Sequence, residues 1–218
     1  MTVRNGGQAL VDALLAHGVD TVFGIPGTHN LAAFAALASS PIRTVLTRHE
    51  QGAGYAADGY ARVAGRPGVC LTTTGPAILN ALAAAAQAWS DSVPVLFISP
   101  GMPTGHPGRG NGLLHEVKNQ QAAVEAVVAY SHRVTSVAEI PLAVTYGFSA
   151  MTTGRPRPVH IEIPLDLLDA EAEVQLVDPV VPAGLAPDAA ALAVAADRLA
   201  AATGPVLIVG GGAKGAAA

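Results

Sequence analysis

Short apolar runs rich in β-branched residues alternate along the chain with longer segments in which apolar residues recur every three or four positions. The short runs fall at residues 21–23, 44–46, 69–72, 95–98 and 159–163. The longer segments fall at residues 8–17, 29–38, 51–63, 78–89 and 140–152. Strands that alternate with helices in this way are typical of βαβ units. The pattern predicts an α/β fold, a doubly wound parallel sheet with helices on both faces.

In such a sheet the strand-to-helix turns gather at the carboxyl ends of the strands, and ligands bind there. The turns in this chain fall at residues 24–30, 48–52, 73–77 and 99–103. We therefore expect the functional residues in these segments and in the helices that follow them.

The periodic pattern stops near residue 169, which gives a first domain over residues 1–169. Residues 170–187 contain Pro, Asp and Glu without periodicity and are interpreted as a linker. A helical pattern at 188–202 and an apolar run at 205–209 predict the beginning of a second, Rossmann-like domain over 188–218. Because one helix and one strand do not bury an independent core, we expect the sequence to be the N-terminal portion of a longer protein.

Composition narrows the class of protein. Half of the residues are apolar and 13% are charged, with a net charge of −4, so the chain has enough apolar material for a core and no basic stripe for nucleic acid. The single cysteine, Cys70, lies in an apolar run and is interpreted as a core residue in a reducing compartment. No signal-peptide pattern and no apolar run long enough to span a bilayer is present. We expect a cytoplasmic protein that binds neither nucleic acid nor membrane.

Glu50 follows a predicted strand and lies in the first turn of the next helix. A carboxylate at this place has an ordinary explanation, because it interacts favourably with the helix dipole. The same helix carries Gly52, Ala56 and Gly59 on one face, and an interior glycine costs about 1 kcal/mol. We expect a partner helix or a flat ligand to approach that face closely.

Two further segments are candidates for a functional role. Thr74, Gly75 and Pro76 form a tight turn with Asn80 about one helical turn later, although for the turn taken alone a simple strand-to-helix connection is the preferred explanation. Residues 100–121 form a long glycine- and proline-rich loop that ends in His115-Glu116, and loops of this length inside an α/β domain are often functional. Without other context, a surface histidine is the favoured interpretation of His115.

Other patterns point to other classes of protein. Residues 210–215 match the Gly-x-Gly-x-x-Gly dinucleotide fingerprint, so a non-catalytic nucleotide-binding or regulatory α/β domain is the alternative function. His49-Glu50 and His115-Glu116 carry metal-ligating atoms, but the zinc and P-loop spacings are missing, and we predict no metal ligand in this chain.

The motifs together, in their order along the chain, resemble those of one family. They are Phe-Gly-Ile-Pro-Gly at 23–27, the run at 48–62 around Glu50, Thr-Gly-Pro at 74–76 with Asn80, Asp-Ser-Val-Pro at 91–94 and Arg-Pro-Val-His-Ile-Glu-Ile-Pro at 157–164. Over about residues 3–169 the chain resembles the N-terminal pyrimidine-binding domain of the thiamine-diphosphate (ThDP) enzymes related to acetolactate synthase and the 2-oxo acid decarboxylases. From residue 188 it resembles the start of their central domain, which binds FAD in some members.

The resemblance implies a role for each motif residue. Glu50 would hydrogen-bond to the aminopyrimidine of ThDP and thereby promote loss of the proton from the thiazolium ring, best in an apolar pocket where burial raises the pKa of the carboxyl group. Pro76 and Asn80 would line the pyrimidine pocket, with Thr74 and Gly75 beside it. The substrate would be a 2-oxo acid, and the cofactor would carry the difficult chemistry.

The sequence departs from acetolactate synthases at two places. Ala77 replaces the last glycine of a Gly-Pro-Gly motif, and Leu114-His115 replaces Phe-Gln before Glu116. These segments and the turn containing Thr28 look closer to the simple 2-oxo acid decarboxylases. By this resemblance Thr28 and His115 would transfer protons after CO₂ is lost, with Glu116 as a third candidate, and the choice between decarboxylation and carboligation stays open.

The diphosphate and Mg²⁺ motifs of the family, Gly-Asp-Gly followed by Asn-Asn, do not occur in this sequence. The resemblance therefore implies that the Mg²⁺ ligands lie in a C-terminal domain and that this fragment alone is inactive. In the family the site lies between two subunits, so a homo-oligomer, dimer or tetramer, is expected. The small-residue face of the Glu50 helix is a candidate for the subunit contact.

Overall fold

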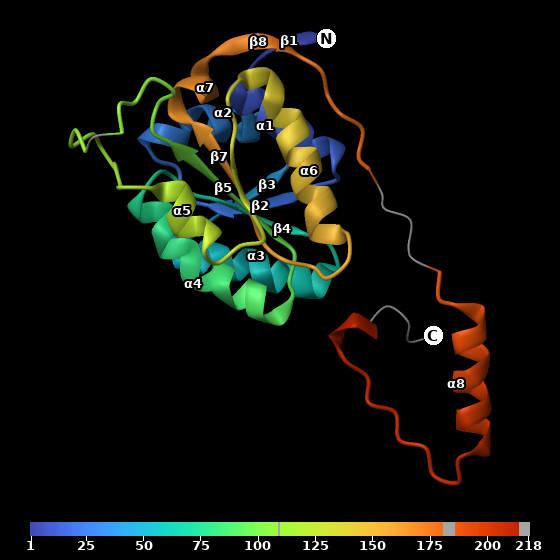
Figure 1. Ribbon diagram of the computed structural model, residues 1–218. Coiled ribbons are helices and arrows are strands. Elements are labelled where there is room, and N and C mark those ends of the chain that lie inside the picture. Colours follow the sequence, from blue (N-terminus) through green and yellow to red (C-terminus); the bar gives the residue numbers. More distant parts are fainter. Residues whose placement is uncertain (109, 181–185, 214–218) are drawn as a thin grey trace. The chain divides into compact units, whose positions relative to one another are not determined.

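A six-stranded sheet forms the centre of the computed structural model, which describes residues 1–108, 110–180 and 186–213 (Figure 1). All of its neighbouring strands are parallel, and their order is β3-β2-β4-β5-β7-β6. The strands are β2 (Thr21–Gly24), β3 (Arg43–Leu46), β4 (Gly68–Leu71), β5 (Val95–Gly101), β6 (Ser131–Arg133) and β7 (Val159–Pro164).

Helices cover both faces of this sheet, as expected for a doubly wound fold. One core cluster joins the sheet to α1 (Gly6–Ala16), α2 (Leu31–Ala38) and α6 (Ile140–Thr152). The other joins it to α3 (Glu50–Ala64), α4 (Pro76–Asp91) and α5 (Gln120–Glu125). Every residue of β4, β5 and β7 is buried, which is why these strands read as nearly continuous apolar runs. The predicted fold class is confirmed.

The expected linker at 170–187 contains a strand, which corrects the sequence interpretation. After the short helix α7 (Leu165–Asp169), β8 (Glu171–Val174) pairs antiparallel with β1 (Thr2–Asn5), with Asn5 opposite Glu171. Both strands have only four residues, and although Glu171 to Val174 alternate polar and apolar residues, a run of this length is too short to predict a strand. Residues 181–185 of the expected linker lie outside the described residues.

The described residues 186–213 belong to a unit separate from the sheet domain. Its described part contains α8 (Ala189–Ala201) and the 3₁₀ turn η3 (Gly211–Ala213). The predicted strand at 205–209 is not formed, because no neighbouring strand among the described residues is available to hydrogen-bond with it. Lys214 and Gly215 of the glycine-rich motif lie outside the described residues.

No helix within the described ranges combines the length and the apolarity needed to cross a membrane.

The tight approach to α3 occurs on a different face from the one that the sequence predicted. A Cβ atom added at Gly54 would lie 2.7 Å from the Cβ of Ala84 on α4, so this glycine lets the two helices pack closely. A Cβ at Gly52 would touch only Thr47, and one at Gly59 would meet nothing within 4 Å. The expected close approach to the face of Gly52, Ala56 and Gly59 is therefore absent from the described fold of this chain.

Replacing Gly54 and Gly59 by alanine, one at a time, tests this packing. Each change removes an interior helical glycine, which by itself stabilises a helix by about 1 kcal/mol. We expect Gly59→Ala to stabilise the protein and Gly54→Ala to destabilise it, because the added methyl group at position 54 overlaps Ala84 and overpacking costs about 1–3 kcal/mol. Urea unfolding of both variants beside the wild type measures the difference. An equal gain in both would contradict the close α3–α4 contact.

Candidate active site

Glu50 is the first residue of α3, directly after the turn that follows β3. The turn is fixed by its own side chains, because Thr47 Oγ1 donates to the carbonyl of His49 at 3.0 Å and His49 Nδ1 accepts from the amide of Gln51 at 3.2 Å. His49 thereby caps the helix, and the Glu50 carboxylate lies at its positive end.

The turn between β4 and α4 adopts an unusual backbone conformation. Gly75 has φ +61° and ψ −115°, and Pro76 follows it as the first residue of α4. A Cβ atom at position 75 would overlap the carbonyl oxygen of His115, so only glycine fits here. The turn thereby packs directly against the long loop that carries His115.

Asn80 lies one turn into α4 and connects this helix to Glu50. Its Nδ2 donates to Glu50 Oε2 at 3.0 Å, so two of the predicted cofactor-binding residues meet at the carboxyl ends of the strands. Glu50 Oε1 accepts no hydrogen bond from any described residue. Glu50 is half-buried, so the apolar pocket expected around its carboxyl group is not complete in the described part of this chain.

The Glu50 carboxylate also affects the thiol of Cys70. Cys70 is fully buried in β4, as the sequence predicted. Burial, and to a smaller extent the charge of Glu50, raise the pKa of the Cys70 thiol. Cys70 therefore stays a neutral core residue and is not a nucleophile.

The turn that carries Thr28 is held by a buried asparagine. Asn30 Nδ2 donates to the carbonyls of Thr72 and Ile25 at 2.9 and 3.1 Å, and Asn30 Oδ1 accepts from the amide of Gly27 at 2.7 Å. Thr28 is exposed at the tip of this turn, in η1 (Thr28–Asn30), and no hydrogen bond joins its side chain to another described residue. The structure therefore does not link Thr28 directly to the other predicted site residues.

His29 and His115 meet beside Thr74. His29 Nδ1 lies 3.0 Å from Thr74 Oγ1, and the rings of His29 and His115 make an edge contact with centroids 5.5 Å apart. His115 adopts a positive φ of 60°, and its Nδ1 is buried without a hydrogen-bond partner among the described residues. Burial, with a smaller effect of the His115 charge, lowers the pKa of His29, so this ring is neutral at neutral pH. Sequence reasoning missed His29, although it follows Thr28 in the same turn.

Glu116 braces its own loop. Its carboxylate accepts from the amides of Asn111 and Leu113 at 3.1 and 3.0 Å and lies 2.9 Å from His106 Nε2. These contacts occupy both carboxylate oxygens, so the structure gives Glu116 a structural role and weakens it as a candidate for proton transfer.

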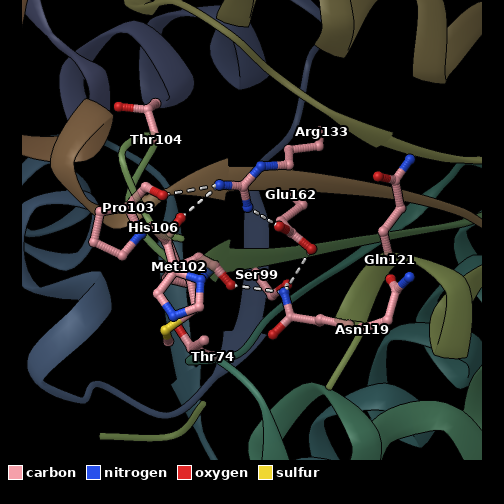
Figure 2. A network of polar contacts seen from close by, with 12 residues as sticks. Thr74, Ser99, Met102, Pro103, Thr104, His106, Asn119, Gln121, Arg133 and Glu162 are labelled. Carbon is pink, nitrogen blue, oxygen red and sulfur yellow. Dashed lines mark hydrogen bonds and ion pairs between the residues drawn. The ribbon is translucent and has the colours of Figure 1, made fainter. Parts of the chain in front are cut away.

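A cavity of about 840 Å³ lies between the long loop and the carboxyl ends of β5, β6 and β7. Thr74, His106, Glu116, Arg133 and Glu162 are among its lining residues, and Figure 2 shows Arg133 and Glu162 paired beside it. Neither Glu50 nor Asn80 lines this cavity. Within the described residues no group of three or more His, Cys, Asp or Glu side chains is placed to hold a metal ion.

Comparisons with known proteins agree with this arrangement. Residues 4–127 match the family described as thiamine pyrophosphate enzyme, N-terminal TPP binding domain. A Pseudomonas aeruginosa protein named probable 2-ketoarginine decarboxylase is 49% identical over 96% of this chain and 38% of its own length. A probable acetolactate synthase large subunit from Methanocaldococcus jannaschii is 38% identical over 78% of this chain and 28% of its own length. An acetolactate synthase from Arthrospira platensis is 38% identical over 95% of this chain and 37% of its own length.

The chain thus spans between 28% and 38% of the length of these three relatives. The family match covers the strand-end turns that carry Glu50, Gly75 and Asn80, which are the parts of the fold that the geometry brings together. The chain belongs to the thiamine pyrophosphate enzyme family and contains its N-terminal TPP-binding domain.

Proposed function

We propose that this chain is the pyrimidine-binding part of a ThDP-dependent enzyme that acts on 2-oxo acids, with Glu50 as the residue that activates the cofactor. The observation that carries the proposal is the Asn80–Glu50 hydrogen bond of 3.0 Å at the strand ends, which leaves Glu50 Oε1 open to a ligand. A carboxyl oxygen held in this way suits a ring nitrogen of an aminopyrimidine, because the contact needs one group that shares a proton with the ring.

The chain's own residues would hold and orient the cofactor. When bound, ThDP supplies the electron sink for cleavage of the bond between the carbonyl and carboxyl carbons of a 2-oxo acid. Asn80 fixes one oxygen of Glu50, so the other oxygen keeps one direction toward the ring. Gly75 itself is buried against the carbonyl of His115, and Pro76, the next residue, is exposed.

Decarboxylation is the reaction that we favour. The relative with 49% identity is named a probable 2-ketoarginine decarboxylase, while the acetolactate synthases are 38% identical. A simple decarboxylation needs a proton donor after CO₂ leaves, and His115 with its unpartnered Nδ1 suits this role. Thr28 is the second candidate, since it is exposed on the neighbouring strand-end turn.

The rest of the assembly follows from the family resemblance. We propose Mg²⁺ as the ion that holds the diphosphate, with its ligands outside this chain, and a cytoplasmic homo-oligomer, a dimer or a tetramer, in which the partner covers the exposed side of Glu50. FAD in the central domain belongs to the same proposal. We do not favour the alternative of a nucleotide-binding regulatory domain, because the family match and the similar proteins support a ThDP enzyme.

Glu50→Gln tests the role of the carboxyl group. Glutamine keeps the size and a hydrogen bond to Asn80 but cannot share a proton with the pyrimidine. In the intact enzyme we expect exchange of the thiazolium C2 proton of bound ThDP to slow by about 10²–10⁴-fold, the usual contribution of a positioned acid or base. Acid quenching followed by proton NMR measures this rate. Glu125→Gln, which changes an exposed carboxylate at the end of α5, is the matched control. Exchange at the wild-type rate in Glu50→Gln would remove Glu50 from cofactor activation.

His115→Ala tests the proton donor. We expect the rate of aldehyde release from a 2-oxo acid to fall by at least about tenfold in the intact enzyme, because the variant lacks the imidazole that would deliver the proton. The rate of C2 exchange in bound ThDP should stay near the wild-type value, since that step depends on Glu50. His132→Ala is the control, because His132 contacts Glu139 and none of the candidate site residues. An unchanged rate of aldehyde release would exclude His115 from the mechanism.

A further inference from the structure

Gln120 is a buried polar residue to which the proposed chemistry gives no role. It is the first residue of α5, directly after the long loop, and only 8% of it is exposed. Its Oε1 accepts from the amide of Gly75 at 2.6 Å. The two N–H groups of its Nε2 are shared among three acceptors, Ser99 Oγ at 3.1 Å, the carbonyl of Pro100 at 2.9 Å and Glu162 Oε2 at 2.9 Å. The amide group is therefore fully used, with the acceptor facing the Gly75 turn and the donors facing the sheet.

The amide of Gly75 depends on this contact. Gly75 precedes the first turn of α4, where backbone N–H groups have no partner inside the helix. In a capping box the amide of the residue before the helix donates to a Glu or Gln side chain at the third helical position, but in α4 that position is Ile78, which has no acceptor. Gln120 supplies the missing partner from a different element.

The other end of Gln120 is anchored in three strands. Ser99 Oγ on β5 lies 2.8 Å from Nε2 of His160 on β7, and Nδ1 of His160 lies 2.7 Å from Ser131 Oγ on β6. Burial lowers the pKa of His160 to about 3, so the ring is neutral and uses one nitrogen as a donor and the other as an acceptor.

Glu162 on β7 is paired with Arg133 on β6, and Arg133 Nη2 also donates to the carbonyl of Met102 at 2.6 Å. Figure 2 shows Arg133 joined by dashed lines to Glu162 and to the carbonyl groups of Met102 and Pro103. The carboxyl ends of the sheet thus form a rigid support for the Gln120 amide.

We propose that Gln120 is a positioning residue of the cofactor site, which holds the Gly75 turn so that α4 presents Asn80 to Glu50. The proposal rests on the proposed function, because it assigns Gln120 to the site that binds the pyrimidine. Gln120 accepts a hydrogen bond from the amide of Gly75 and is the first residue of α5, the helix that follows the His115 loop. Gly75 also packs against the carbonyl of His115, so Gln120 connects the Gly75 turn, α5 and this loop. Loss of its amide leaves a buried N–H group without a partner, which loosens the turn.

Gln120→Met in the intact enzyme tests this role, since methionine has a similar length and no hydrogen-bonding amide. Hydrogen–deuterium exchange of the peptide at residues 73–79, read by mass spectrometry without ThDP, reports on the Gly75 amide. We expect this peptide to exchange about tenfold faster or more, as for a lost buried hydrogen bond, and ThDP to bind about tenfold more weakly. The KM for the 2-oxo acid at saturating ThDP should stay within about twofold of the wild-type value, because the proposal assigns Gln120 to the Gly75 turn and not to substrate binding.

Gln121→Met is the matched control. Gln121 is the next residue of the same helix, and its Nε2 donates to the carbonyl of Ser131 at 2.8 Å and not to the Gly75 turn. We expect wild-type exchange at residues 73–79 and wild-type ThDP affinity in this variant. If Gln120→Met does not fold, Gln120→Asn takes its place, because it keeps the amide but is too short to reach Gly75, and the same changes are expected.

The outcomes separate the two proposals. Unchanged ThDP affinity in Gln120→Met, beside a wild type that binds ThDP, overturns the role of Gln120 and leaves the proposed function intact. An equal effect of Gln121→Met also overturns it, because the change would then be general loosening of α5. A wild-type enzyme that binds no ThDP overturns the proposed function, and the positioning role with it.

Discussion

The turn between β4 and α4 has no room for a side chain, and the whole candidate site depends on this constraint. Gly75 adopts a positive φ and lies against the carbonyl of His115, so the loop after β5 and the start of α4 occupy fixed positions relative to each other. Because α4 begins at this turn, its direction sets where Asn80 lies. Asn80 in turn reaches Glu50 on α3. One backbone conformation thus connects three segments that are distant in the sequence.

The surroundings of this turn explain why so many polar residues are buried in an apolar sheet. Thr72, Thr74, Ser99, His160 and Glu162 are all buried, and they lie in or directly after the central strands. At the carboxyl ends of parallel strands the chain leaves the sheet, so main-chain groups lose their ladder partners and need others. Side chains such as Asn30 and Gln120 supply these partners across distances of 42 and 45 residues in the sequence. The edge of the sheet is therefore both polar and rigid, which suits a site that must hold a ligand in one orientation.

The sequence predicted those parts of the molecule whose signal is local. The apolar runs of β4 and β5 and the amphipathic pattern of α1 and α4 follow from burial, so the fold class could be read directly. The strands β6 and β8 could not be predicted, because they have only three and four residues and each forms by pairing with a neighbouring strand. The same limit applies to the site. Glu50 and Asn80 stood out through family motifs, whereas His29 and Gln120 matter because of contacts with Thr74 and Gly75, and no local pattern encodes such contacts.

The burial of Glu50 in the structure differs from the burial that the family resemblance implies. The resemblance implies a carboxyl group in an apolar pocket, yet the described fold covers only one side of Glu50 and gives it one partner. The Gly52, Ala56 and Gly59 face of the same helix is also open, since a Cβ at Gly59 would meet nothing within 4 Å. A helix that carries small residues on an open face permits close approach by another surface, at a cost of about 1 kcal/mol for each interior glycine. The desolvation that would favour a shared proton at Glu50 must then come from the bound cofactor and from whatever packs on this face. In the proposed enzyme one chain would fix the activating acid, and assembly would complete its desolvation, so the chemistry would depend on the quaternary structure.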